Sequence, residues 1–232
     1  MLDLYTWPTP NGRKIHMMVE ELGIPYTVKP VNITKGEQFD PAFLAINPNH
    51  KIPAAVDWKG PGGKPIVLFE SATILEYLAE KHGQFLPSEA RARWTVKQWL
   101  YFQMGGVGPM FGQQGHFNRY APEPIPYAQQ RYDNEVKRLY DVMNRRLGDV
   151  PYLGGDYSIA DMATYPWAMG WENRKVDMAD FPNVQRWLAA IAARPATQRA
   201  WAILSDNVTK PGPISEEHRR AYFGDMQYQK RS

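Results

Sequence analysis

Residues 47–57, NPNHKIPAAVD, place Pro53 at the mouth of a short predicted strand, where a backbone hydrogen-bond donor is normally needed. A trans proline at this position would be an ordinary strand boundary. A cis proline would be a deliberate bend that turns the backbone of Ile52 outward, toward a group with which it can pair. The chain on either side of this stretch decides between the two interpretations.

The first 82 residues alternate between strand and helix patterns. Ile15, Met18, Val19 and Leu22 recur at helical spacing after Asn11, and Ser71 is expected to cap a second helix. Short strands are predicted over residues 2–6, 26–31, 54–57 and 66–69. The order βαβ followed by ββα predicts a small α/β domain with a mixed sheet over residues 1–82.

The composition changes after residues 82–89, HGQFLPSE, which are predicted to form a linker. Strand patterns disappear, and helices are predicted over residues 90–103, 126–147, 158–168 and 184–193. Ser158 and Asp161 have the spacing of a capping box. Residues 90–232 are therefore predicted to form an all-helical domain with a polar tail, whose role no pattern indicates.

Composition and charge exclude several classes of function. The chain has 232 residues and a net charge of +3 with interspersed signs, so no nucleic-acid partner is expected. No apolar stretch approaches the roughly 20 residues that span a bilayer, and no secretory leader is visible, so a cytoplasmic protein without a membrane partner is expected. The absence of cysteine excludes disulfides and a protein-borne redox thiol, and five scattered histidines predict no metal site.

Three motifs together resemble the glutathione transferase family: NPNHKIPAAVD, LFESATILEYLAEK and YLGGDYSIADMATYPW. They lie in the expected order across nearly the whole chain. The stretches YTWPTPNGRK and GGVGPMFGQQGHFNRYAPEPIPYAQQRY resemble the first turn and the insert of the nu class of bacterial glutathione transferases, which is similar to the fungal nitrogen-regulator-like members.

This resemblance implies a thioredoxin-like first domain, glutathione as co-substrate, and a homodimer. The activity that it implies is glutathione-dependent reduction of small disulfides. Conjugation of glutathione to small electrophiles, or peroxidase activity, is the alternative within the family. A non-catalytic glutathione-binding interaction module is the alternative of another class; the fungal regulators that show it carry a long polar extension before the α/β unit, whereas this chain starts directly at its first strand.

The resemblance also implies which residues bind the tripeptide. It makes Pro53 cis, so that the backbone of Ile52 pairs with the cysteinyl unit as an added strand would. Glu70 is expected to bind the γ-glutamyl ammonium and Ser71 the adjacent carboxylate. Two further residues, Gln38 and Lys51, are expected at the rest of the ligand; without the resemblance, Gln38 is a surface glutamine and Lys51 a solvated lysine.

The thiol of glutathione has to be activated, because a thiol with a pKa near 8.5 is only about 3% thiolate at pH 7. The resemblance makes Thr9 and Asn11 the donors to sulfur; taken alone, they are a turn residue and a helix cap. Tyr5 is the weaker candidate for the activating hydroxyl. Arg131, otherwise one of many surface charges, is expected to contact glutathione from the helical domain.

Overall fold

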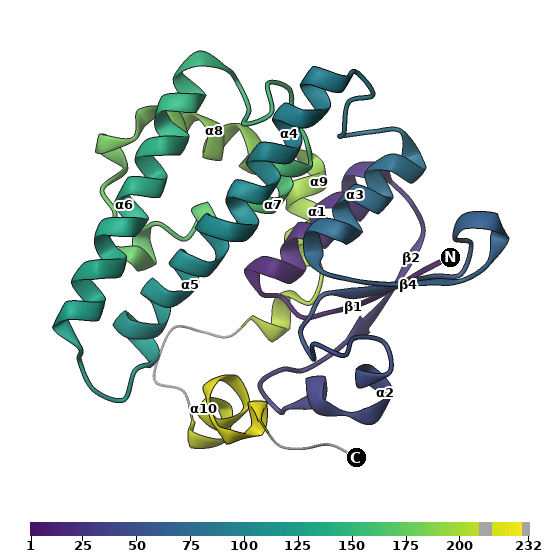
Figure 1. Cartoon of the computed structure of the whole chain (residues 1–232), viewed down its shortest axis with the longest axis horizontal. Coiled ribbons are helices and arrows are strands. Elements are labelled where there is room, and N and C mark those ends of the chain that lie inside the picture. Colours follow the sequence, from purple (N-terminus) through teal and green to yellow (C-terminus); the bar gives the residue numbers. More distant parts are fainter. Residues whose placement is uncertain (209–214, 229–232) are drawn as a thin grey trace.

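The computed structural model describes residues 1–208 and 215–228, which form an α/β part and a helical part packed side by side (Figure 1). The predicted architecture of a mixed-sheet domain followed by a helical domain is confirmed. Within these described ranges, no helix is both long enough and apolar enough to cross a membrane.

The α/β part is built on a four-stranded sheet with the strand order β2-β1-β3-β4. Strand β1 pairs in parallel with β2 and antiparallel with β3, and β3 pairs antiparallel with β4. The four strands are β1 (Leu2–Thr6), β2 (Tyr26–Pro30), β3 (Ala54–Asp57) and β4 (Ile66–Phe69). Their observed positions agree with the predicted ranges to within a residue.

Side chains alternate across this sheet, so that its two faces carry different cores. Leu4 and Ala55 belong to the large core formed with helices α1 (Pro10–Leu22) and α3 (Ser71–His82). Their neighbours Tyr5 and Ala54 face the opposite side, toward Phe43 of the short helix α2 (Pro41–Leu44). Tyr5 therefore lies in the sheet packing, with its ring centroid 6.2 Å from that of Phe43.

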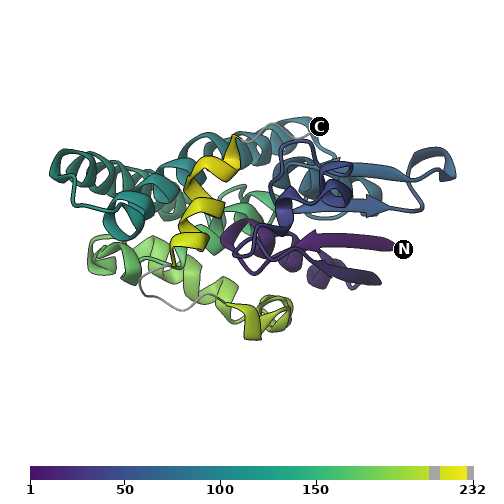
Figure 2. The same ribbon diagram turned by 90° about the horizontal axis from the view of Figure 1, so that it is seen from below.

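Helix α1 joins the two parts of the molecule, because it packs on α3 and also on α7 and α9 of the helical part. The helical part contains seven α-helices within the described residues: α4 (Ala90–Phe102), α5 (Gly108–Gly115), α6 (Pro126–Asp149), α7 (Ile159–Ala168), α8 (Pro182–Ala192), α9 (Pro195–Ala202) and α10 (Glu216–Phe223). Figure 2 shows α10 lying across the junction of the two parts.

The capping box predicted at the start of α7 is confirmed. Ser158 accepts a hydrogen bond from the N–H of Ala160, and the Asp161 carboxylate accepts one from the N–H of Ser158. Asp161 is fully buried and also accepts hydrogen bonds from the backbone N–H of Leu153 and from the indole of Trp187, each at 2.9 Å. This carboxylate therefore holds together three segments of the helical core.

The structure corrects one local prediction, the cap at Ser71, and one alternative, the cap at Asn11. Ser71 does not cap α3: the cap position is Glu70, whose side chain makes no capping bond, and Ser71 is the first helical residue. The first helix is capped by Thr9, whose Oγ1 accepts from the N–H of Gly12 at 3.2 Å, so Asn11 lies inside the first turn. The side chains of Glu70, Ser71 and Asn11 are thereby left for other partners.

Candidate functional site

A cleft opens between the α/β part and the helical part, and it consists of three cavities of about 980, 230 and 210 Å³. Asn11 and Lys51 line all three of them, so the cavities share walls and form one continuous site. Seven of the predicted site residues besides Arg131 are held on two loops and two helix starts: Thr9, Asn11, Lys51, Ile52, Pro53, Glu70 and Ser71. Gln38, from the loop after β2, lines the 230 Å³ cavity.

The loop before β3 forms one wall of the smallest cavity. Its Ile52–Pro53 peptide bond is cis, which answers the question that the sequence raised. Asn47 holds the loop from beneath: its Nδ2 donates to the carbonyl of Lys51 at 2.6 Å, and its Oδ1 accepts from the N–H of Asn49 at 2.9 Å. The backbone before the strand is therefore fixed by a buried side chain rather than by the sheet.

The opposite wall is the start of α3. Glu70 is exposed and has φ 67° and ψ 119°, a conformation that non-glycine residues rarely adopt outside functional sites. Its carboxylate lines the 210 Å³ cavity, next to the buried hydroxyl of Ser71. A negative side chain thus stands beside a helix N-terminus that favours anions, an arrangement suited to a ligand that carries an ammonium and a carboxylate together.

Lys14 lies behind Ser71, one helical turn after Asn11. Its ammonium donates to Ser71 Oγ at 3.2 Å and to Gln103 Oε1 at 2.8 Å, and it lies 3.6 Å from the sulfur of Met104. Burial lowers the pKa of Lys14 to about 7, and the nearby Glu70 carboxylate raises it by less. The helical part therefore contacts the predicted glutathione residues through this lysine.

Asn11 is oriented by a residue of the other part of the chain. The indole Nε1 of Trp167 in α7 lies 3.0 Å from Asn11 Oδ1. An indole N–H can only donate, so the oxygen of the amide is fixed toward Trp167 and the Nδ2 donor is left for the cleft. Thr9 lines the same cavity as Asn11; its oxygen accepts from Gly12, which leaves its O–H as a donor.

The chain's C-terminal segment forms the third wall. Tyr222 and Phe223 of α10 line the two larger cavities, and Gln227 just after the helix accepts a hydrogen bond from Lys51 Nζ at 2.8 Å. Gln38 Nε2 lies 3.5 Å from the carbonyl of Ala221. Two of the predicted glutathione contacts are therefore also contacts of the tail.

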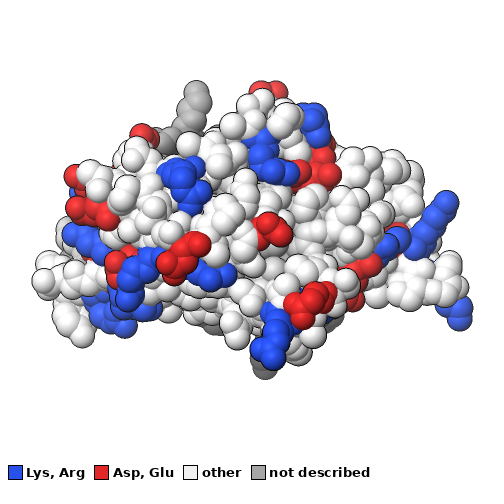
Figure 3. Space-filling view, turned by 90° about the horizontal axis from the view of Figure 1, so that it is seen from above, with Lys and Arg blue, Asp and Glu red and all other residues white. Residues whose placement is uncertain are grey.

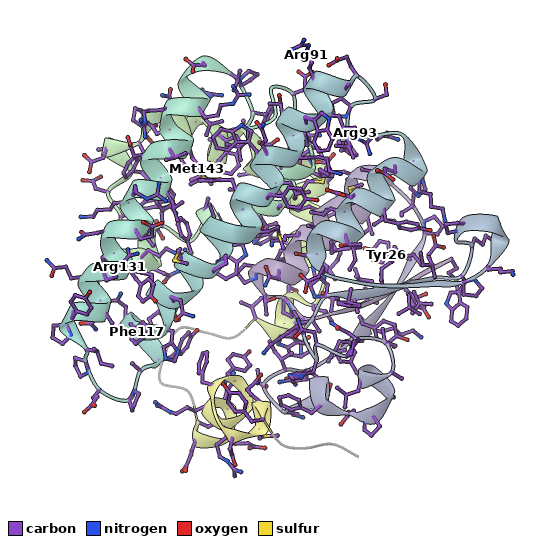
Figure 4. All side chains as sticks on the ribbon, in the orientation of Figure 1. Tyr26, Arg91, Arg93, Phe117, Arg131 and Met143 are labelled. Atoms are coloured by element: carbon purple, nitrogen blue, oxygen red, sulfur yellow. The ribbon has the colours of Figure 1, made fainter. Side chains whose placement is uncertain are left out.

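Arg131 is not brought to this cleft within a single chain. It lies on α6 with an exposed side chain, 3.9 Å from Glu135, and Figure 4 shows it projecting from the outer side of the helix. Its contact with glutathione stays a prediction.

Sequence reasoning missed several residues of the cleft: Lys14, Asn47, Met104, Trp167, Tyr222 and Gln227. Lys14 carried a usable signal, because it follows Asn11 by three residues on the same helix face and is flanked by core positions. The others come together only through packing between distant segments.

Among residues 1–208 and 215–228, no three His, Asp or Glu side chains lie close enough together to hold a metal ion. On the face shown in Figure 3, acidic and basic side chains are interspersed rather than gathered in a single field.

Comparison with known proteins gives matches along most of the chain. Residues 9–81 match the model of the glutathione S-transferase N-terminal domain, and residues 126–190 match the model of the C-terminal domain. The disulfide-bond oxidoreductase YfcG of Escherichia coli is 52% identical over 202 residues, which are 86% of this chain and 94% of that protein. The disulfide-bond oxidoreductase YghU of the same organism is 38% identical over 241 residues, covering 97% and 82%.

Several solved structures have the same fold as this chain. A glutathione transferase from Pseudomonas putida, with one glutathione disulfide bound per subunit, has a TM-score of 0.84 and 44% identity and covers 87% of this chain and 91% of its own. One from Burkholderia graminis, with two glutathione molecules bound per subunit, has a TM-score of 0.81 and 47% identity and covers 86% of each chain.

Proposed function

The chain belongs to the glutathione transferase family, and we propose that it reduces small disulfides with glutathione as the electron donor, in the manner of the nu class. The observation that carries this proposal is a cleft lined by the hydroxyl of Thr9 and the amide of Asn11, in a chain that has no cysteine of its own. Two related proteins are named disulfide-bond oxidoreductases, and one solved relative holds glutathione disulfide.

We propose residues 1–82 as the glutathione-binding domain and residues 90–232 as the domain that completes the substrate site. The ammonium of the γ-glutamyl unit pairs with Glu70, and its carboxylate binds at Ser71 and the N-terminus of α3. The cysteinyl unit pairs with the backbone of Ile52, beside the cis Pro53. Lys51 binds the glycyl carboxylate, and Gln38, which lines the same cavity, contacts the tripeptide nearby.

The thiolate is stabilised where these contacts place the sulfur, beside Thr9 and Asn11. A hydrogen bond to a charged acceptor contributes roughly 1.5 to 3 kcal/mol. At about 1.36 kcal/mol per pKa unit, one such donor lowers the thiol pKa by about one to two units. Glutathione bound in this way is roughly a quarter to three quarters thiolate at pH 7, and a thiolate is the attacking species in disulfide exchange.

The reaction then uses two molecules of glutathione. The bound thiolate attacks one sulfur of the substrate disulfide, forms a mixed disulfide, and releases the first substrate thiol after it takes up a proton. A second glutathione thiolate attacks the glutathione sulfur of that mixed disulfide, so that glutathione disulfide and the second substrate thiol are released. The cavity of about 980 Å³ beside the sulfur position has room for the second reactant.

The reaction itself is the first test. The purified chain is expected to reduce 2-hydroxyethyl disulfide with glutathione at a kcat/KM at least tenfold above its value for conjugation of glutathione to chlorodinitrobenzene. Both rates are measured in steady state, the first through coupled reduction of the glutathione disulfide formed.

Two results would contradict the proposal. Efficient conjugation without disulfide reduction would replace it with the transferase alternative. Tight binding of glutathione without turnover of either substrate would replace it with a binding module.

We also propose that the protein is a homodimer in the cytoplasm. The reaction consumes reduced glutathione, and the cytosol is the compartment in which glutathione keeps thiols reduced.

Four large apolar side chains are exposed on β4 and α4: Val67, Phe69, Trp94 and Tyr101. Exposed aromatic side chains are enriched at protein interfaces. In a dimer, Arg131 would have a second cleft within possible reach, whereas in a single chain it has none.

Trp94, which is 63% exposed, provides the test of the dimer. Trp94→Glu is expected to shift the mass measured by light scattering from about twice the 26.6 kDa of one chain toward that of a monomer, because it places a charge in an apolar contact. Val208→Glu after α9, at an apolar side chain that is 49% exposed, is the matched control and should leave the mass unchanged. A wild-type protein with the mass of one chain would contradict the proposal directly.

A further inference from the structure

Lys14 is a buried cation without a counter-ion. Its side chain is 1% exposed, and in the described parts of the chain no carboxylate lies within ion-pair distance of its ammonium. Its three partners are a hydroxyl, an amide oxygen and a thioether, all of them neutral. Burial of an unpaired charge is costly, so a lysine is retained at such a position only where something compensates its charge or its charge is itself variable.

Other charged groups near Lys14 do not neutralise it. Glu70, beyond Ser71, is the one carboxylate whose charge reaches it, and across the cleft stand His50, Lys51 and His116. On α1 itself, the neighbouring Arg13 turns away and donates to the carbonyls of Ala200 and Ile203. The groups around Lys14 are thus mainly neutral or basic, which leaves a place for a negative charge from outside the protein.

We propose that Lys14 supplies the counter-charge for the α-carboxylate of the γ-glutamyl unit at Ser71, and that binding of the ligand adds a proton to Lys14. This inference rests on the proposed function, because it takes glutathione as the ligand. It assigns to Lys14 a role in binding although Lys14 does not touch the ligand. The lysine acts on the carboxylate through the hydroxyl of Ser71.

The hydroxyl of Ser71 explains how the two groups are coupled. A protonated Lys14 donates to Ser71 Oγ, so the hydroxyl hydrogen points away from Lys14; it can turn from its weak acceptor, the Met104 sulfur at 3.8 Å, to the ligand's carboxylate. A neutral Lys14 accepts from the hydroxyl instead, and the carboxylate then loses both the donor and the positive charge. Protonation of Lys14 and binding of the anion therefore favour each other, as linkage requires.

The direction of the pH dependence follows from this coupling. In the free protein, burial holds the pKa of Lys14 at about 7. A bound carboxylate raises that pKa, so the ligand takes up a proton as it binds and its affinity falls as the pH rises above 7. Lys14 is therefore partly neutral in the free protein near pH 7.5, and the ligand is expected to take up a measurable fraction of one proton there.

The test is titration calorimetry with S-methylglutathione at pH 7.5, repeated in phosphate and in Tris, whose ionisation enthalpies differ. The methyl group removes the thiol, so thiol ionisation cannot contribute to the protons counted. The wild type is expected to show the uptake given above. Lys14→Met, which keeps the length and the apolar stem of the side chain, should bind about tenfold more weakly, or 1.4 kcal/mol, and lose that part of the uptake.

Two comparisons separate the contribution of Lys14 to proton uptake from other contributions. The ammonium of the ligand also titrates, but it does so equally in both proteins, so the difference between them belongs to Lys14. Lys64→Met, at an exposed loop position, is the matched control and should behave as the wild type. Between pH 7 and 8.5 the affinity should fall more steeply for the wild type than for Lys14→Met.

Three outcomes would overturn the inference. Binding by the wild type without proton uptake, or with the same uptake and affinity in Lys14→Met, removes Lys14 alone and leaves the proposed function intact. The first of these needs no variant, so it holds even if Lys14→Met does not fold. A wild type that does not bind S-methylglutathione at all overturns the proposed function, and this inference with it.

Discussion

Asn11→Ala is expected to lower kcat/KM for the reduction of 2-hydroxyethyl disulfide by about 10- to 100-fold. The substitution removes the Nδ2 group that we propose as a donor to the glutathione sulfur, and loss of a hydrogen bond to a charged group costs roughly 1.5 to 3 kcal/mol. The pKa of the bound thiol should rise by about one to two units at the same time. Titration of the thiolate absorbance near 240 nm in the presence of bound glutathione measures that pKa.

Trp167→Phe is the companion variant for this prediction. It removes the indole N–H that holds the amide of Asn11 and keeps an aromatic ring packed over Gly112. The thiol pKa is expected to shift in the same direction as in Asn11→Ala, and the double variant should have the same thiol pKa as Asn11→Ala, because the indole N–H reaches the sulfur through Asn11. An unchanged thiol pKa in Asn11→Ala, with glutathione still bound, would remove Asn11 from the activation of sulfur and leave Thr9 as the candidate.

Asp161→Ala is expected to lower the free energy of unfolding by about 3 to 5 kcal/mol. The carboxylate accepts four hydrogen bonds in the core, from Leu153, Trp187 and twice from Ser158, and each donor left unsatisfied in a buried position costs about 1 to 3 kcal/mol. The loss is partly offset, because burial raises the pKa of Asp161 to about 6 and thus shows that its charge is costly there. Urea unfolding followed by tryptophan fluorescence gives the difference.

Asp141→Ala is the matched control for Asp161→Ala. Asp141 is an exposed carboxylate on α6, paired with Arg145 four residues later, and such pairs contribute only about 0.3 to 0.5 kcal/mol. A loss of less than 1 kcal/mol in Asp161→Ala would show that the capping box and its links to Leu153 and Trp187 do not hold the helical core.

Much of the fold could be predicted because its hydrophobic patterns are local. The four strands and the helices α1, α3, α4, α6, α7 and α8 have apolar residues at the spacing of their secondary structure. Helix α5 was not predicted because its sequence, GPMFGQQG, contains three glycines, which disfavour a helix in isolation. It is flanked by π-helical turns and is held by packing on α6 and α7.

The residues of the site likewise fall into those that belong to local motifs and those that depend on packing between distant segments. Thr9, Glu70 and Pro53 belong to short motifs, so their positions could be predicted from a resemblance over a few residues. Trp167 acts on a residue 156 positions away, and Gln227 meets Lys51 across 176 positions. Such contacts follow from how two domains and a tail pack together, and no spacing along the chain indicates them.

The hydrogen bond from Trp167 to Asn11 has a consequence for how this enzyme fails. It crosses from the helical domain to the residue proposed to activate sulfur, and it breaks when the two domains shift by about an ångström, since a hydrogen bond weakens steeply beyond its normal length. The shared core that α1 joins is held by non-directional apolar contacts, which weaken more gradually with such a shift than this hydrogen bond does. Turnover should therefore decline under mild urea or warming before either domain unfolds. The catalytic rate would then report a small displacement between the two domains earlier than any measurement of unfolding.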